Sequence, residues 1–257
     1  MTRSWGVLIV AAAVMGLVPS GIHPAAIEAT TTVCNARSLT VHVPDDSYFS
    51  VYNATPSVNT TCVRASPGRS SFTISRTWQH GYWGFPNISS GWEWDHYSCT
   101  GAGGACFQYP VQEKDDGMPL TSAGVVINGH GIADYDIWFN KTDAHPGQDD
   151  GTEVLLWMRH PGVGMHSVVG TVDIEGIRFT VLHWVAQGHG VTWNYVAYVC
   201  ENQRSNLRNF WLNGLFRDAI SRHYLSPYWW LTGIDLGDEI TSGGDGSVVS
   251  WSLRGVK

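Results

Sequence analysis

Two glutamates stand in settings that are unusual for acidic residues and that could do chemistry together. Glu153 lies inside an apolar run, residues 152–157, where a carboxylate is costly unless it faces a groove. Glu239 lies in residues 236–244, where glycines would let a ligand approach the backbone closely. Hydrolysis of a glycosidic bond needs two such carboxyl groups, one ionised and one protonated, on opposite sides of the bond.

Each glutamate also has a simpler interpretation. Glu153 could be a solubility-favouring residue of an edge strand, and Glu239 could be an ordinary turn acid beside Asp238, because glutamates are mostly exposed. Neither residue decides between the interpretations alone, so the elements around them matter.

Period-two alternation predicts two strands around these acids. In residues 134–140 and 153–158 each strand would turn one face to a core and the other face outward. The core-facing sets are Tyr135, Ile137 and Phe139 in the first strand and Val154, Leu156 and Met158 in the second. The opposite faces carry Asp134, Asp136, Trp138 and Asn140 in the first strand, and Glu153, Leu155 and Trp157 in the second.

Further strand-like runs fill the rest of the chain. They span residues 125–128, 178–186, 193–200, 228–236 and 247–253, and Gly, Asn and Asp separate them. Apolar residues at helical spacing predict one helix over residues 206–224. We therefore expect an all-β fold, a jelly roll of two stacked, curved antiparallel sheets with one helix packed outside.

Composition excludes several classes of protein. The 257 residues carry a net charge of −7 and no run of Lys or Arg, which argues against a nucleic-acid or anionic-membrane surface. The 13 tryptophans exceed the needs of a core and indicate a surface on which flat molecules stack. Phosphate- and dinucleotide-binding motifs are absent, and neither Cys nor His shows ligand spacing, so we expect no cofactor and no metal.

The N-terminal residues have the pattern of a secretory signal peptide. Arg3 precedes the apolar residues 5–18, and small residues follow, with cleavage expected after Ala29 or, alternatively, near Ser20. The apolar run is shorter than the roughly 17–25 residues of a membrane-spanning helix. We therefore expect a signal peptide at 1–29 and one exported domain at 30–257, with no membrane attachment after cleavage.

Five cysteines in an exported chain indicate disulfides. Cys34 and Cys62 flank a pair of expected N-terminal strands, and Cys99 and Cys106 bracket a glycine-rich loop. We predict the bonds Cys34–Cys62 and Cys99–Cys106. Cys200 ends an expected strand and should be a buried lone thiol.

Three segments taken together resemble those of a known family. Residues 152–157 read Thr-Glu-Val-Leu-Leu-Trp, residues 134–138 read Asp-Tyr-Asp-Ile-Trp, and residues 236–244 read Leu-Gly-Asp-Glu-Ile-Thr-Ser-Gly-Gly. They resemble the nucleophile strand, the upstream Ser-Tyr-Asp strand and the acid/base segment of glycoside hydrolase family 12, the compact jelly-roll endoglucanases. The order and spacing agree, Phe-Pro-Asn at 85–87 resembles the family's Tyr-Pro-Asn, and four cysteines lie where bacterial members carry two disulfides. The resemblance spans residues 33–251.

The resemblance implies a retaining mechanism and a role for each residue. Glu153 would be the nucleophile and Glu239 the acid/base, with carboxyl groups about 5–5.5 Å apart. Asp136 would orient the nucleophile. Burial or the charge of Glu153 should raise the pKa of Glu239, so that it starts protonated.

Substrate binding would involve aromatic side chains. Trp157 and Trp138 would line the floor of a groove, although Trp138 could equally be a core residue, and Asn53 matches an asparagine of the family's Asn-Asn-x-Trp. Thr55 stands where that motif has its tryptophan, and Leu155 and Asp238 replace a methionine and an aromatic residue. A different loop, residues 162–166, follows the nucleophile strand.

These departures leave the substrate open. The leading interpretation is a secreted, monomeric, bacterial endo-β-1,4-glucanase, with a xyloglucan-specific enzyme of the same family as a close alternative. A jelly-roll protein that binds glycans without cleaving them would keep the aromatic residues and lose turnover. A secreted adhesin that binds host protein is a third interpretation and would not need paired carboxylates.

Overall fold

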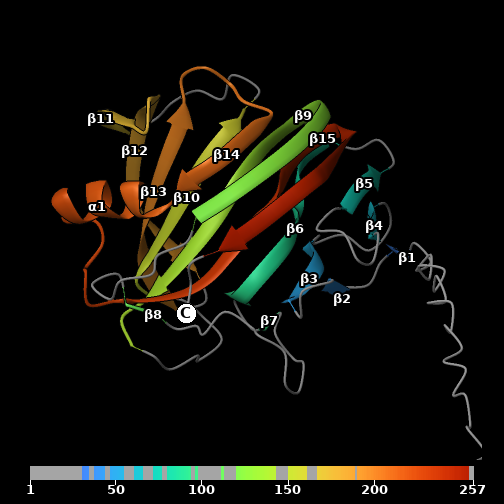
Figure 1. Cartoon of the computed structure of the whole chain (residues 1–257), viewed down its shortest axis with the longest axis horizontal. Helices are drawn as coiled ribbons and strands as arrows, with labels where there is room; N and C mark the ends of the chain where they lie inside the picture. Colours follow the sequence, from blue (N-terminus) through green and yellow to red (C-terminus); the bar gives the residue numbers. More distant parts are fainter. Residues whose placement is uncertain are drawn as a thin grey trace, which may run out of the picture.

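A computed structural model gives the structure of the chain (Figure 1). It describes residues 31–34, 38–43, 47–54, 61–65, 72–76, 80–93, 96–97, 111–112, 120–142, 150–160, 167–188 and 190–254. The N-terminal strands are β1 (Thr31–Cys34), β2 (Ser38–Val43), β3 (Ser47–Ala54), β4 (Thr61–Ala65), β5 (Phe72–Arg76), β6 (His80–Glu93), β7 (His96–Tyr97) and β8 (Val111–Gln112). The others are β9 (Leu120–Asn140), β10 (Thr152–Arg159), β11 (Val168–Ile174), β12 (Ile177–Gly188), β13 (Val191–Cys200), β14 (Asn206–Trp211) and β15 (Trp230–Arg254), with helix α1 (Asn213–Ser221). The predicted signal peptide at 1–29 lies outside the described residues.

Two long strands, β9 and β15, run antiparallel along nearly their whole length and belong to both layers of the fold. The start of β9 and the end of β15 pair with β14 and β5, and β4 and β1 continue that layer outward. The other halves pair with β10 and β6 and continue into a second, larger layer. The expected all-β jelly roll is confirmed.

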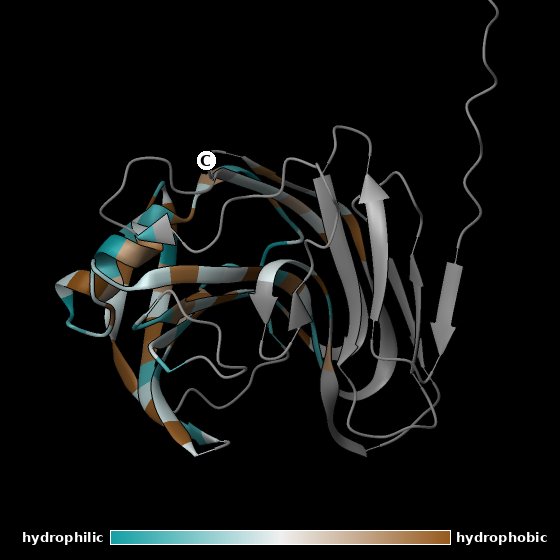
Figure 2. Ribbon diagram, turned by 90° about the horizontal axis from the view of Figure 1, so that it is seen from below, coloured by the Kyte–Doolittle hydropathy of each residue, from teal (hydrophilic) through white to brown (hydrophobic). Residues whose placement is uncertain are grey.

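The β9 strand turns back over itself, and this bend creates the sandwich. Residues 14 apart on a straight strand would be roughly 46 Å apart. Yet the hydroxyl groups of Thr121 and Tyr135 are 2.8 Å apart inside the core, and the Trp251 indole N–H donates to Thr121 over 3.3 Å. Breaks in register around Ser242 of β15 lie beside this bend, as bulges do where strands curve. The strands follow strongly curved paths (Figure 2).

The larger layer continues from β9 through β10, β13 and β12 to β11. Its strands are antiparallel, with the exception that β10 and β13 run parallel, Glu153 opposite Tyr195. A parallel pair needs a crossover connection, and here the chain makes it through β11 and β12. The sequence prediction of purely antiparallel sheets missed this pair.

The predicted helix at 206–224 is wrong in its first part. Residues Asn206–Trp211 form β14, which pairs with β9, and helix α1 begins only at Asn213. Leu207 and Phe210 are both buried although they are three residues apart, because the register shifts between them and Asn209 has a positive φ of 48°. This irregular strand has the apolar spacing of a helix. No helix in the described part of the chain is long and apolar enough to span a membrane.

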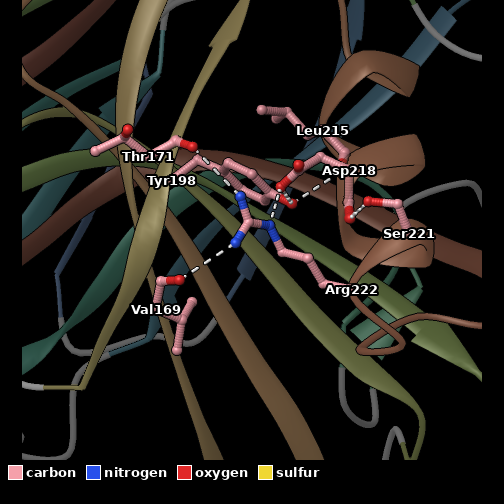
Figure 3. Close-up of polar contacts among 7 residues, drawn as sticks. All are labelled: Val169, Thr171, Tyr198, Leu215, Asp218, Ser221 and Arg222. Carbon is pink, nitrogen blue, oxygen red and sulfur yellow. Dashed lines mark hydrogen bonds and ion pairs between the residues drawn. The ribbon is translucent and has the colours of Figure 1, made fainter.

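Helix α1 is held to the sheet by a polar cluster at its C-terminal end (Figure 3). Arg222 forms an ion pair with Asp218 at 2.7 Å and also donates to the backbone carbonyls of Val169 and Thr171 in β11. The Tyr198 hydroxyl of β13 lies 3.0 Å from both the Leu215 carbonyl and the Asp218 carboxylate. Two strands therefore fix the position of the helix, while its apolar side faces the core.

The main core lies between the two layers and under α1. It contains the predicted core-facing residues of β9 and β10, all essentially inaccessible to solvent. Cys200 is a buried free thiol, as predicted, and burial raises its pKa to about 12. Phe216 of α1 packs edge-on against Phe139 of β9, with ring centroids 4.9 Å apart.

We predict that Phe216→Ala lowers the free energy of unfolding by about 3–5 kcal/mol, because it leaves a cavity between α1 and β9. Tyr228→Ala is the matched control, since Tyr228 is 67% exposed, and it should change stability by less than about 0.5 kcal/mol. Chemical denaturation measures both. Equal losses in the two variants would contradict the assigned packing of α1.

Candidate active site

The candidate site lies on the face of the larger layer that is turned away from the main core, here called the site face. Alternation along the strands sends core residues to one side and the acidic and aromatic residues to the other, as predicted for β9 and β10. An apolar floor covers part of the site face. It consists of Ile132, Leu155, Trp157, Leu182, Ala197 and Val199, with Trp184 and Tyr195 packed against it.

Glu153 lies on the site face of β10, only 7% exposed, and has a strong hydrogen-bond donor. The indole N–H of Trp193 in β13 donates to its carboxylate over 2.6 Å. Hydrogen bonds to an ionised group are roughly twice as strong as neutral ones. Trp193 therefore fixes one carboxylate oxygen of Glu153, and the interpretation of Glu153 as an exposed edge-strand residue is wrong.

Asp136 lies on the neighbouring strand β9 and is also only 7% exposed. The register places Trp138 directly opposite Glu153 and Asp136 directly opposite Leu155. Asp136 and Glu153 are thus diagonal neighbours on the same face of adjacent strands, a spacing that long side chains bridge. On the strand that flanks β9 on its other edge, β15, the residue directly opposite Asp136 is Asp235.

Glu239 lies on β15, one strand beyond β9, and is paired with Ile132 of the site-face floor. Its side chain is half-buried. Burial raises its pKa to about 7, so its carboxyl group is protonated below neutrality. The predicted rise in pKa is confirmed, with burial as its cause. Asp238 alternates to the other side of the strand, where its carboxylate sits against Gly131.

Glu153 and Glu239 act electrostatically on the same two groups. The charges of both raise the pKa of the Tyr195 hydroxyl in β13, after burial as the largest cause. Both also raise the pKa of Asp134 in β9, again after burial. Coulomb interactions fall off with distance, so both glutamates lie close to Asp134 and Tyr195. The curved sheet gathers acids from β9, β10 and β15 into one site.

Aromatic rings border the acids on the β12 and β13 side. Trp184 and Tyr195 are stacked, with centroids 3.8 Å apart and an interplanar angle of 22°. Trp138 is 1% exposed and packs against Trp193 with centroids 5.8 Å apart. Trp138 thus supports the residue that holds Glu153, and its expected contact with substrate stays a prediction.

No protein-family model and no curated protein matches this sequence. Solved structures do match it. A metagenome-derived glycoside hydrolase family 12 endoglucanase matches with a TM-score of 0.72 and 23% identity, over 88% of this chain and 98% of that chain. Endoglucanase cel12A from Rhodothermus marinus matches with a TM-score of 0.72 and 24% identity, over 88% and 100% of the two chains.

The fold is that of glycoside hydrolase family 12. A native family 12 xyloglucanase from Bacillus licheniformis also shares it, with a TM-score of 0.70 and 18% identity over 88% of this chain and 99% of that chain. The resemblance drawn from the sequence motifs is therefore confirmed for the fold. At these identities the likeness concerns the fold alone.

Within this family 12 fold, sequence reasoning missed four site-face residues. Trp193 and Tyr195 are on β13, which was predicted as a strand without a site. Asp134 was assigned to the correct face but given no role, and Asp235 was seen only as part of a strand. The alternation of residues 193–200 could have placed the first two on one face; only strand pairing places Asp235 opposite Asp136.

Several other predictions remain untested. Asn53 belongs to β3, where its backbone pairs with Pro86 of β6. The backbone register places Cys34 of β1 directly opposite Cys62 of β4, which suits the predicted bond. Cys99, Cys106, Thr55 and the loop at 162–166 lie outside the described residues. Among the side chains that are described, no three His, Cys, Asp or Glu residues group in a way that could hold a metal ion.

We predict that Glu239 makes the protein more stable in acid than in alkali. Its pKa is about 7 in the folded chain and about 4.3 in an unfolded one, so its stabilising proton is fully present below pH ~4.3 and lost as the pH rises through ~7. Across that window the free energy of unfolding should fall by about 4 kcal/mol on account of this residue. Denaturant titrations from pH 4 to 9 measure this fall, and Glu239→Gln should reduce the slope of the unfolding free energy against pH. An unchanged slope in that variant would contradict the assignment.

Proposed function

We propose that this protein is a retaining endo-β-1,4-glucanase. The observation that carries the proposal is the arrangement of three acids on one face of the sheet: Glu153 held by the Trp193 indole, Asp136 diagonal to it, and Glu239 with a pKa of about 7. Retaining glycosidases use one ionised and one protonated carboxyl group with distinct environments. The family 12 fold supports the same reaction.

In this proposal Glu153 attacks the anomeric carbon while Glu239 donates its proton to the leaving oxygen. The products of that step are a glycosyl ester on Glu153 and a carboxylate on Glu239. Glu239 then takes a proton from water as the water attacks the ester, which restores both groups. Asp136 would orient Glu153, and its burial beside β10 supports that role. A carboxyl separation of about 5–5.5 Å stays a prediction of this mechanism.

The aromatic side chains of the site face support a sugar polymer as substrate. Trp157 of the floor and the stacked pair Trp184–Tyr195 are apolar surfaces of the kind on which sugar rings pack. The similar structures named above are two endoglucanases and a xyloglucanase. We therefore propose a β-1,4-linked glucan, with xyloglucan as the second substrate to test and Asn53 as a further contact.

The remaining features complete the proposal. The N-terminal pattern at 1–29 supports export, most simply from a bacterium, with the mature domain at 30–257 acting as a monomer outside the cell. Two disulfides, Cys34–Cys62 and Cys99–Cys106, would brace its N-terminal strands, and the opposed backbones of Cys34 and Cys62 support the first. No cofactor takes part in the proposed reaction.

The test is covalent trapping of the intermediate. The mature protein is incubated with a 2-fluoro β-cellobioside, and mass spectrometry locates the adduct. We expect it on the peptide that contains Glu153, and we expect none in Glu153→Gln. An adduct on another residue would overturn the assignment of the nucleophile. Binding of cellulose or xyloglucan without an adduct and without release of reducing ends would instead favour the glycan-binding alternative.

We also predict that Trp193→Phe lowers kcat by about 10- to 100-fold with little change in KM. The variant keeps an aromatic ring against Trp138 but loses a hydrogen bond to a charged group, which is worth about 1.5–3 kcal/mol. Trp184→Phe is the matched control, because it should change mainly KM. Hydrolysis of a soluble β-glucan measures both, and a kcat within about twofold of the wild type for Trp193→Phe would show that this bond does not orient Glu153.

A further inference from the structure

Asp134 is a fourth acid of the site, and the proposed mechanism does not use it. It lies on the site face of β9, two residues before Asp136, and its side chain is 0% exposed. Strand pairing places it between Trp157 of β10 and Gly237 of β15. Neither carboxyl oxygen has a hydrogen-bond partner among the described residues. An ionised carboxylate in such a place would lack the partners that buried charges need.

Acids on every strand packed against Asp134 act on it electrostatically. They are Asp136 on β9, Glu153 on β10 and Glu239 on β15, with Asp238 on the opposite side of β15. Asp235 of β15 lies opposite Asp136, and the pKa of the Tyr195 hydroxyl on β13 is raised by Asp134 in turn. Of the side chains described on β9, β10 and β15, the one cation is Arg159, at the end of β10.

Burial is the largest cause of a pKa for Asp134 well above the usual range. The charges of Glu239, Asp136, Asp238 and Glu153 raise it further, in that order. Geometry and electrostatics therefore both favour the protonated form of this carboxyl group.

We propose that Asp134 is a buried acid of the site that keeps its proton throughout the neutral range, so that only Glu153 and Glu239 change charge during the reaction. The effect of Asp134 on turnover rests on the function proposed above, whereas the protonation state of Asp134 does not.

The first chemical step shows why a neutral Asp134 matters. The C–O bond to the leaving sugar breaks, a C–O bond to Glu153 forms, and the proton of Glu239 moves to the leaving oxygen. One negative charge thereby disappears from Glu153 and one appears on Glu239. An ionised Asp134 would repel that new charge, because like charges close together in a protein interior disfavour ionisation. A protonated Asp134 does not repel it, and Glu239 can then serve as a base for the second step.

The direct test compares the full-length wild type with Asp134→Asn, which copies a protonated aspartate in shape and charge. Difference infrared spectra at pH 7 should show a carbonyl band of a protonated carboxylic acid in the wild type that is missing in the variant. If the variant instead loses a carboxylate band, Asp134 is ionised and the proposal is overturned. Asp134→Ser, which has a small uncharged polar side chain, serves if the asparagine variant does not fold.

Two further measurements exclude a merely structural role. A carboxyl group with a raised pKa in the folded state loses its stabilising effect as the pH rises through that value, so the denaturation midpoint of the wild type should fall towards alkaline pH more steeply than that of Asp134→Asn. A steeper fall in the variant would overturn the proposal. Hydrolysis assays give the apparent pKa of the basic limb of the kcat/KM profile. If this pKa is lower by about one pH unit or more in Asp134→Asn, the substitution has removed a negative charge, and the proposal is overturned.

These measurements separate the two proposals. The spectra and the denaturation curves need no substrate, so they decide the state of Asp134 even if no adduct forms on Glu153. An adduct on Glu153 together with an ionised Asp134 would leave the glucanase proposal in place and remove this one.

Discussion

The pairing of β9 with β15 is the constraint on which the rest of the structure depends. The two strands stay paired on both sides of the bend, so each contributes one half to either layer. The contact between Thr121 and Tyr135 holds the halves of β9 face to face. The same pairing carries Asp136 and Asp235 to opposite positions and places Glu239 beside the floor of the site. A change in this register by one residue would turn these acids into the core and the core residues outward.

The candidate site brings several acids close together, and their simultaneous ionisation would be unfavourable. A metal ion is one solution in other proteins, but the acids described here do not form such a group. This chain instead combines a hydrogen-bond donor for Glu153 with burial that raises the pKa values of Glu239 and Asp134. The result is a set of chemically similar groups in different states, and this difference is what acid–base chemistry requires. Stability that depends on bound protons is the accompanying cost, because it declines in alkaline solution.

Much of the fold could be predicted from the sequence because the strands around the site alternate cleanly. Alternation predicts the core face of β9 from Tyr135, Ile137 and Phe139, and Asp136 must then lie on the opposite face. The helix was placed too early because the bulged strand β14 buries Leu207 and Phe210 at a helical interval. No local pattern could reveal that β10 and β13 run side by side in parallel, since that pairing arises from the crossover through β11 and β12. Trp193 escaped notice for the same reason: its donor reaches Glu153 from 40 residues away.

The position of β15 has a consequence for how the molecule is made. This strand follows all the others described, yet it lies between β6 and β9 and pairs with both. A growing chain therefore exposes two unsatisfied strand edges until the last segment arrives, and such edges invite pairing with other chains. The late segment also brings Glu239, so a partly synthesised chain lacks this acid of the candidate site. The addition of β15 thus completes the sheet and the candidate site together, and an incomplete chain has neither a complete sheet nor a complete site.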